Sequence, residues 1–237
     1  MLGQRVVWIG GGAAALWLAV RVAALAVHAR GMGPVLPTGM VPAFMAAFIG
    51  VFTPILLLLA QLAGPLPNWR RLVAAGGATF LVAVMFEIGV DEAFLRVTGA
   101  LAWQYRVAPV LGGSTSLVGV VMWPLYGAFV VAVQDGLRQR QIAESRFSRA
   151  AILAGEAMFL EVAANLFALL GFHGWFFFYL PDDLKHFTTF AVALPYFVAG
   201  LVGVTILDQL ERVARPVWIG VGCWGVAAIV VGVAAAG

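Results

Sequence analysis

Two glutamates, Glu87 and Glu161, lie inside long apolar stretches of the sequence. Glu87 stands in ATFLVAVMFEIGV, and Glu161 stands in AAILAGEAMFLEVAANLFALL. An ionisable side chain in the hydrocarbon of a membrane costs about 3 kcal/mol on insertion scales, so such a residue usually has a partner or a function. A buried protonated acid can give its proton to an alkene or an epoxide, and a second carboxylate can stabilise the resulting cation. We therefore take Glu87 as a candidate general acid and Glu161 as the counter-charge or second acid.

Each glutamate has a polar neighbour one helical turn later. Asp91 follows Glu87 by four residues and Asn165 follows Glu161 by four, so each shares a helix face with its glutamate. Two neighbouring carboxyls in a low dielectric do not both ionise cheaply, which makes Asp91 a third catalytic candidate. Asn165 either orients Glu161 or makes a structural bond between helices. The alternative for the first pair is structural: Glu87 pairs with Arg21, and Asp91 hydrates the helix end.

Glu156 also lies in the second acidic stretch, five residues before Glu161. Five residues correspond to about 140° around a helix, so the two side chains do not serve one site from one face. We expect Glu156 to partner an arginine of another helix or of the cytoplasmic side.

The composition is that of a protein whose surface faces lipid. Of the 237 residues, 63% are hydrophobic and 11% are charged, whereas a soluble domain is nearer half and a quarter. No large soluble domain fits in what remains, so we expect residues 1–237 to form a single all-α transmembrane domain. The net charge of +3 then reports orientation in a bilayer and not affinity for nucleic acid. The one cysteine, Cys223, allows no internal disulfide.

Seven stretches of about 20 residues are long enough to cross a hydrocarbon layer of about 30 Å as helices. Pro42 is expected to open the second of these helices and Pro54 to kink it, while Gly76 and Gly77 predict close packing between helices. The stretches are Val6–Val27, Val41–Ala63, Leu72–Val90, Leu117–Gln134, Arg149–Gly171, Phe187–Leu207 and Pro216–Ala235.

The basic residues of the loops indicate the orientation. Nine arginines fall on the side of the N-terminus, whereas Arg30, Arg96, Arg106 and Lys185 fall on the other. This bias predicts a cytoplasmic N-terminus in a plasma membrane such as the bacterial inner membrane. The two longest loops, 91–116 and 172–186, then lie on the outer side. The first reads as an interfacial helix or a continuation of the third span; the second has five consecutive aromatic residues that would dip into the headgroups or cap a pocket.

The two glutamates also look like equivalent points of a duplicated unit. An offset near 73 residues spans two helices and preserves their direction, so it predicts a parallel repeat with units at about 72–137 and 149–210. Each unit would bring one acid to a central chamber near the outer surface. Landmarks recur 71 to 74 positions apart: Glu87 and Glu161, Trp103 and Trp175, Pro124 and Pro195, and Asp135 and Asp208.

Other polar residues indicate no further chemistry. Asp135 and Asp208 end their helices beside arginines and are expected to form solvated ion pairs. The polar cluster of the second outer loop fits no compact metal-ligand motif, so we expect neither a metal nor another cofactor. That cluster consists of His173, Asp182, Asp183, Lys185 and His186.

The stretch TGALAWQYRVAPVLGGSTSLVGVVMWPLYGAF resembles membrane enzymes of carotenoid metabolism. In lycopene cyclase domains and carotenoid hydratases, an acid-bearing helix leads to a loop with Gly, Trp and Tyr, and then to a Pro-led helix. The small seven-helix terpene cyclases, thought to work by carboxyl proton donation, are similar through Glu87 and Glu161. The lycopene cyclase signature of Pro followed shortly by two acids is absent at Pro124 and Pro195.

This resemblance implies a carotenoid- or isoprenoid-modifying cyclase or hydratase that acts on a hydrophobic isoprenoid or lipid and uses no redox cofactor. Two other functions remain open: a non-catalytic membrane subunit that binds a lipid, a carotenoid or partner helices, and a small transporter with Glu87 and Glu161 as proton sites. For the enzyme we expect a substrate-binding wall, aromatic in most of its members so that it stabilises carbocations, formed by Trp103, Tyr105, Asn165, Trp175 and Tyr179.

Overall fold

The computed structural model describes residues 33–213 and 215–236, and this part of the chain is mostly helical. Six helical segments in it are long and apolar enough to cross a membrane, as expected for a multi-pass helical membrane protein. The expected span Val6–Val27 lies outside the described residues. The long helices are α2 (Val41–Ala63), α3 (Trp69–Thr98), α4 (Gly119–Gln139), α5 (Arg146–Phe172), α6 (Ala193–Leu210) and α7 (Pro216–Ala236).

Short elements lie in the connections between the long helices. Strands β1 and β4 pair antiparallel, with Trp103 opposite Tyr179 and Tyr105 opposite Phe177. Strands β2 and β3 form a second antiparallel pair. The short elements are the 3₁₀ helices η1 (Thr38–Met40), η2 (Leu111–Gly113) and η3 (Phe190–Val192), and the strands β1 (Trp103–Tyr105), β2 (Pro109–Val110), β3 (Thr115–Ser116) and β4 (Phe177–Tyr179).

Helix α3 is longer than the stretch expected from its apolar run. It begins after Asn68, whose side chain accepts a hydrogen bond from the Arg71 N–H at 3.1 Å, which satisfies one of the free donors of the first turn. It ends at Gly99, which has a φ of 77°, a left-handed conformation that glycine adopts without steric cost. The residues after Val90 therefore continue the third span and do not form a separate interfacial helix.

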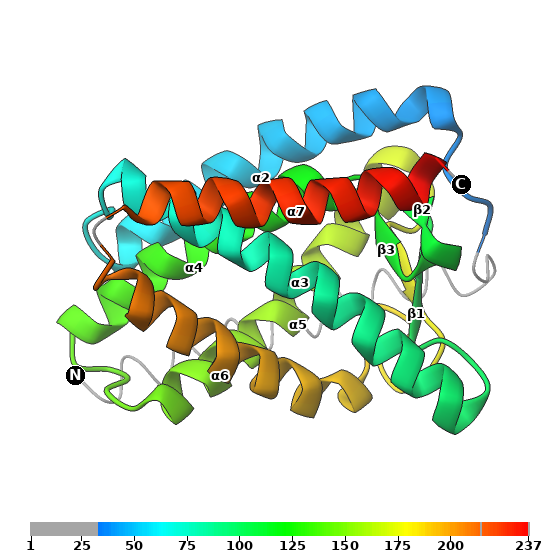
Figure 1. Cartoon of the computed structure of the whole chain (residues 1–237). Coiled ribbons are helices and arrows are strands. Elements are labelled where there is room, and N and C mark those ends of the chain that lie inside the picture. Colours follow the sequence, from blue (N-terminus) through cyan, green and yellow to red (C-terminus); the bar gives the residue numbers. More distant parts are fainter. Residues whose placement is uncertain (1–32, 214, 237) are drawn as a thin grey trace.

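The long helices pack mainly in neighbouring pairs (Figure 1). Helix α3 packs along α4 and α7, α5 packs along α6, and α2 packs along α4. We call residues 69–139, with α3 and α4, the first hairpin, and residues 146–210, with α5 and α6, the second hairpin. Contacts between α3 and α6 and the pairing of β1 with β4 join the two hairpins.

Glycine permits the close approach of α3 and α7. A Cβ atom added to Gly77 would lie 1.9 Å from the carbonyl oxygen of Gly220, and one added to Gly220 would lie 2.5 Å from the Cα of Ala74. These distances leave no room for a side chain. Close packing at Gly77, as the sequence predicted, is therefore confirmed.

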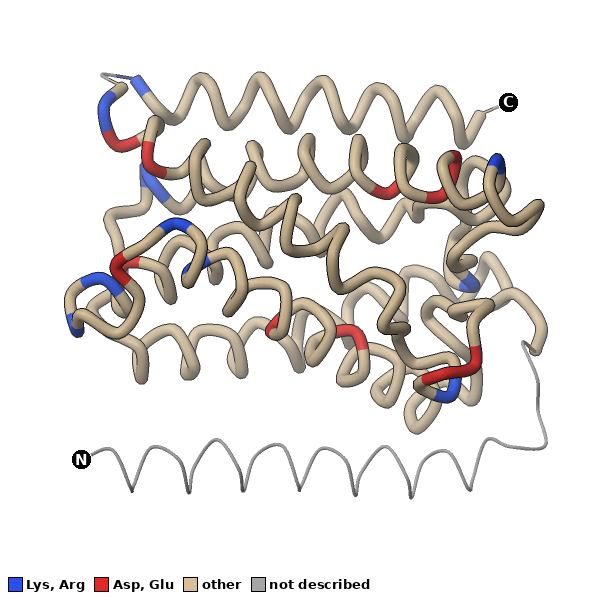
Figure 2. Tube along the Cα trace, turned by 90° about the horizontal axis from the view of Figure 1, so that it is seen from below, with Lys and Arg blue, Asp and Glu red and all other residues tan. Residues whose placement is uncertain are grey.

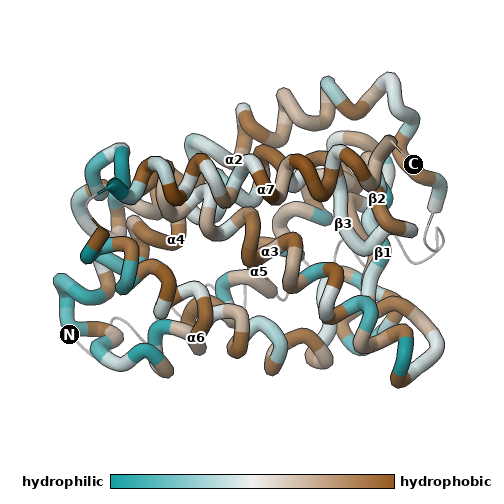
Figure 3. Tube along the Cα trace, viewed as in Figure 1, coloured by the Kyte–Doolittle hydropathy of each residue, from teal (hydrophilic) through white to brown (hydrophobic). Residues whose placement is uncertain are grey.

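Charged residues gather at two ends of the bundle, and the residues of the helices between them are largely apolar (Figures 2 and 3). At one end Arg71 binds both oxygens of Asp135, at 2.7 and 3.0 Å. Arg149 binds both oxygens of Asp208 there, at 3.0 and 2.9 Å. The ion pairs expected for these two aspartates are present. The side chains of Asp135 and Asp208 are only 12% and 13% exposed, so they are less solvated than expected.

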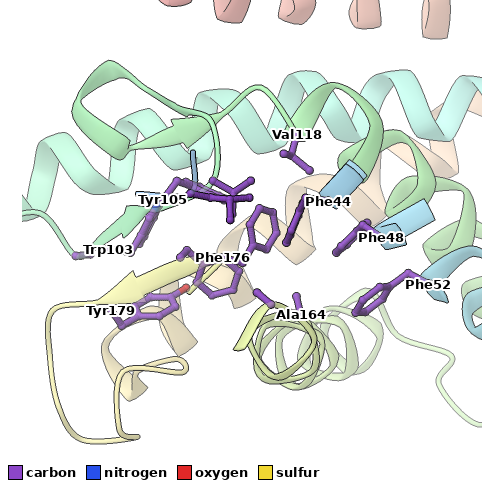
Figure 4. Close-up of a cluster of buried hydrophobic side chains, with 14 of the residues drawn as sticks. Phe44, Phe48, Phe52, Trp103, Tyr105, Val118, Ala164, Phe176 and Tyr179 are labelled. Carbon is purple, nitrogen blue, oxygen red and sulfur yellow. The ribbon is translucent and has the colours of Figure 1, made fainter. Parts of the chain in front are cut away.

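A cluster of aromatic rings packs α2 against the second hairpin. Phe44 and Phe48 of α2 contact Phe167 of α5 and Phe176 next to β4, with ring centroids 5.3–5.9 Å apart. Figure 4 shows Phe176 beside Tyr105 and Tyr179, so the cluster reaches the paired strands. The strands and the ends of the hairpins thus share one hydrophobic core.

Candidate functional site

A cavity of about 180 Å³ lies among α2, the two hairpins and the paired strands. Its wall is mostly apolar, and both Glu87 and Glu161 belong to it. The chain has four tyrosines, and all four line this cavity. Trp103, another residue of the expected substrate-binding wall, lines it as well. The acids and phenols of the wall are Glu87, Tyr105, Tyr126, Glu161, Tyr179 and Tyr196.

Glu87 is held by two hydroxyl groups of the loop that connects α3 to α4. The Tyr105 hydroxyl donates a hydrogen bond to Oε1, and the Thr115 hydroxyl donates one to Oε2 at 2.7 Å. The Glu87 side chain is buried, with 4% of its surface exposed. Its proposed structural partner, Arg21, lies outside the described residues.

Glu161 is held by three hydroxyl groups of the second hairpin. Tyr179 and Tyr196 both donate to Oε1, and Thr188 donates to Oε2 at 2.7 Å. The two phenol oxygens are 2.9 Å apart. Glu161 itself is half-buried.

The two sets of contacts use similar spacings along the chain. Each glutamate binds the tyrosine 18 residues later. The threonine follows Glu87 by 28 residues and Glu161 by 27. The same kinds of groups thus reach both carboxyls from loops of nearly equal length.

Asp91 and Asn165 also make similar contacts, and they make them with the backbone. Asp91 Oδ1 accepts hydrogen bonds from the N–H groups of Ala102 and Trp103, at 2.9 and 3.4 Å. Asn165 Oδ1 accepts from the N–H groups of Phe176 and Phe177, both at 3.2 Å. Both residues therefore position the segments that lead into β1 and β4.

These contacts show what the polar neighbours of the two glutamates bind. Asp91 makes no hydrogen bond to Glu87, and Asn165 makes none to Glu161; Asn165 instead donates to the Phe187 carbonyl at 3.2 Å. Neither residue belongs to the cavity wall. Their locations favour a positioning role over direct contact with a substrate.

The aromatic run from Trp175 to Tyr179 divides between the cavity and its surroundings. Phe177 and Tyr179, in β4, line the cavity. Trp175 lies outside the wall and packs against Phe178 and Phe187, with ring centroids 5.2 and 5.1 Å away. The expected lining role thus fits the location of Tyr179 and not that of Trp175.

Burial keeps the two phenols of the strands protonated. Desolvation raises the pKa of Tyr105 well above its ordinary value, and Glu87 raises it further when it is ionised. The pKa of Tyr179 is raised well above its ordinary value by the same cause, with the charge of Glu161 adding to it. Both phenols therefore remain hydrogen-bond donors to their glutamates.

Glu156 has no such partner. Both of its carboxyl oxygens are buried, and neither makes a hydrogen bond within the part of the chain that the structure describes. The expected arginine partner is thus not found among residues 33–213 and 215–236.

The polar cluster between residues 173 and 186 makes local contacts. His186 stacks on Phe178 and contacts the Tyr179 carbonyl at 2.7 Å through Nδ1. Asp183 accepts hydrogen bonds from the Thr189 hydroxyl at 3.0 Å and the Phe190 N–H at 2.8 Å. Among the described residues, no group of three or more His, Cys, Asp and Glu side chains could hold a metal ion.

Sequence reasoning missed three residues that bind the glutamates: Thr115, Thr188 and Tyr196. The available signal was the spacing itself, since a hydroxyl residue falls 27 or 28 positions after each glutamate. Tyr196 follows Pro195, one of the landmarks of the expected repeat, but nothing in that pattern indicates the direction of the tyrosine side chain.

No family model, curated protein or solved structure matches the chain.

Proposed function

We propose that the chain is an integral-membrane enzyme that modifies an isoprenoid or a carotenoid, as a cyclase or a hydratase. The observation that carries the proposal is that Glu87 and Glu161 line one apolar cavity, each bound by a phenol and a threonine hydroxyl. An apolar cavity suits a hydrocarbon chain. Two carboxyls in such a site suit proton transfer to an alkene or an epoxide.

In the proposed reaction, Glu87 is the general acid. Its O–H bond breaks, and either a C–H bond forms at the alkene or an O–H bond forms at the epoxide oxygen while one epoxide C–O bond breaks; in both cases a carbocation results. Three donated hydrogen bonds help Glu161 to carry negative charge. That charge and the faces of the aromatic wall stabilise the cation. In cyclisation, another double bond of the chain attacks the cation and forms the ring C–C bond, and the cation that results loses a proton to give a cyclic alkene. In hydration, the cation captures water, and the oxonium that results loses a proton to give an alcohol.

The proposal includes the arrangement in the membrane. We propose seven spans, with residues 6–27 as the first, a cytoplasmic N-terminus in a bacterial inner membrane, and a parallel repeat of units 72–137 and 149–210. The bias of nine arginines against four basic residues in the loops supports the orientation. The equal spacing from Glu87 to Tyr105 and from Glu161 to Tyr179 supports the duplication.

The test uses Glu87→Gln, with Glu92→Gln as the matched control. Glu92 lies on the same helix but is exposed and bound to Arg96 at 2.7 Å. Purified protein in liposomes is incubated with acyclic polyenes of about 20 to 40 carbons, the size expected of an isoprenoid or carotenoid in a hydrophobic site, and products are identified by mass spectrometry. We expect conversion by the wild type and by Glu92→Gln, and a loss of about 100-fold or more in Glu87→Gln. Unchanged turnover by a folded Glu87→Gln protein contradicts the proposal.

A proton-coupled transporter is the second candidate, and Glu156 is the observation that favours it. The Glu156 carboxyl, whose two oxygens are buried without a hydrogen-bond partner among the described residues, lies on the same helix as Glu161. Ionisable residues inside a bundle are typical of proton pathways. Flux measured in proteoliposomes should then depend on pH and fall in the Glu161→Gln and Glu156→Gln variants. Flux that is the same in both variants as in the wild type counts against transport.

A further inference from the structure

Three oxygen atoms at the Glu161 end of the cavity form a hydrogen-bonding triangle. The hydroxyls of Tyr179 and Tyr196 both donate to Glu161 Oε1, and their oxygens are 2.9 Å apart. Each phenol has one proton to donate, so two protons serve three contacts. A third proton, on Glu161, completes a ring in which each oxygen donates one hydrogen bond and accepts one. The triangle therefore has a place for one additional proton.

Tyr196 is the phenol of this triangle that a molecule in the cavity can reach more easily. Tyr179 is 1% exposed and is fixed in β4, opposite Trp103. Tyr196 is half-buried and belongs to the cavity wall. Its ring also contacts Phe86 of the first hairpin, at 5.7 Å between centroids. Tyr196 thus joins Glu161 to the part of the wall next to Glu87.

The Glu87 end has no second phenol among the described residues. At that end the cavity wall includes Trp123 of α4, whose indole N–H interacts with Glu87 but lies outside hydrogen-bond geometry. An indole N–H donates a hydrogen bond but does not accept one, so it does not pass a proton on. The other ionisable groups around the cavity are Tyr105 and Tyr126.

We propose that Tyr196 and Glu161 form a proton relay, in which Tyr196 exchanges protons with the molecule in the cavity and Glu161 stores them. During uptake, a proton leaves the bound molecule and forms a new O–H bond on Tyr196. The proton that Tyr196 held before moves to Glu161 Oε1. Tyr196 is neutral before and after, Glu161 changes from carboxylate to acid, and no electrons are transferred.

The relay also sharpens the proposed reaction, and that part rests on the proposed function. If Glu87 protonates a polyene, a second double bond attacks the carbocation and closes a ring; Tyr196 then removes a proton from the cyclic cation, and the product is a cyclic alkene. Glu161 then releases its proton to water and Glu87 regains one from water, which balances the cycle. The relay thus favours cyclisation over hydration.

The first test needs no substrate. The full chain in lipid nanodiscs, with ring-labelled tyrosine, is titrated while infrared bands of protonated carboxyls and of tyrosine C–O groups are recorded. Glu161→Gln identifies the Glu161 band. We expect tyrosine bands to shift together with the Glu161 band in the wild type, because Tyr179 and Tyr196 both donate to Glu161 Oε1. Tyr196→Phe should remove the Tyr196 part of this shift, and Tyr179→Phe should leave it. An unchanged tyrosine shift in Tyr196→Phe, or a Glu161 band that does not titrate, overturns the relay. Titration of the carboxyl in folded Tyr196→Phe excludes a general loss of structure.

The second test uses geranylgeraniol and lycopene as probes. If the wild type converts one of them, Tyr196→Phe should still consume it, because Glu87 is intact. The ratio of cyclic alkene to water-captured alcohol should fall about tenfold, the size of one lost proton-transfer partner at the low end of general-base effects. An unchanged ratio overturns the assignment of Tyr196. If the wild type converts neither probe while the infrared bands behave as expected, the relay stands and the proposed enzyme function fails for these probes.

Discussion

The first and second hairpins hold their glutamates in the same way but surround them differently. Each carboxyl accepts a bond from a tyrosine 18 residues later and from a threonine 28 or 27 residues later. Only Glu161 accepts from a second phenol, Tyr196. Glu87 is 4% exposed, whereas Glu161 is half-buried. The shared hydrogen bonds fix the position of each carboxyl. The two carboxyls differ in their exposure and in the number of hydroxyl groups that donate to them.

This contrast suggests a division of roles between the carboxyls. A buried acid with few donors is suited to give one proton to a substrate fixed in front of it. A more accessible carboxyl with three donors is suited to carry charge and to exchange protons. This division of roles would be wrong if replacing either carboxyl had the same effect on turnover.

Exchanging the carboxyls for amides tests the division of roles with the largest expected effect. Glu87→Gln removes the acid, so polyene turnover should fall about 10²- to 10⁴-fold, whereas Glu161→Gln should lower it less. Because both act in one reaction, the double variant should be no slower than Glu87→Gln alone. Turnover of the four proteins under identical conditions measures this. Multiplicative losses in the double variant would show that the carboxyls work independently.

Asp91 and Asn165, which position the segments that lead into β1 and β4, differ in charge, and this difference offers a second test. Asp91→Asn keeps the oxygen that binds the Ala102 and Trp103 N–H groups, so we expect little change in stability. Asn165→Asp loses the amide N–H that donates to the Phe187 carbonyl and places a carboxylate oxygen against that carbonyl oxygen. It should lower the free energy of unfolding by about 1–3 kcal/mol. Thermal unfolding in detergent compares the two variants, and equal losses would contradict the contacts described.

High pH should weaken the packing around the strands. The pKa values of Tyr105 and Tyr179 are raised well above the ordinary tyrosine value by burial and then by the adjacent glutamates. Below about pH 10 both phenols are protonated in the folded and the unfolded chain, so their contribution to stability is fully present. Above it, only the unfolded chain loses these protons. Stability should therefore fall by about 1.4 kcal/mol per pH unit for each phenol.

Thermal unfolding measured between about pH 8 and pH 11, on either side of the ordinary tyrosine pKa, checks whether stability falls as the pH rises. Tyr105→Phe and Tyr179→Phe should each remove part of the slope, by similar amounts. A slope that is unchanged in both variants would show that these phenols are not the groups responsible.

The sequence predicted the spans and the acidic residues better than the loops. Apolar length located the six described helices, because a membrane demands about 20 apolar residues for each span. It ended the third span at Val90, since charged residues follow, whereas α3 continues to Thr98. Of the charged residues there, Glu92 and Arg96 pair on an exposed surface, whereas Asp91 is buried and accepts hydrogen bonds from the loop backbone.

The contacts in the loops were harder to predict, because periodicity does not give the direction of a side chain in a short strand. Trp103 was matched with Trp175 by residue type, at 72 positions. The hydrogen bonds instead relate Tyr105 to Tyr179, at 74 positions. Trp175 packs on Phe178 and Phe187, away from the cavity. The missed residues are threonines and a tyrosine, types with many uses in loops, and only their contacts with a glutamate single them out.

The smallest expected effect concerns the threonines, the feature in which the two ends of the cavity are most alike. Thr115→Val and Thr188→Val keep the shape of the side chain and remove the hydroxyl that binds Oε2, at 2.7 Å in both cases. One lost hydrogen bond corresponds to about 1 kcal/mol, or about a fivefold change in turnover. If Glu87 is the acid, the hydrogen bond from Thr115 that orients its Oε2 atom matters for the first proton transfer, and Thr115→Val should lower turnover. Glu161 keeps two other donors, so Thr188→Val should have a weaker effect. A stronger effect of Thr188→Val would reverse the roles of the two carboxyls.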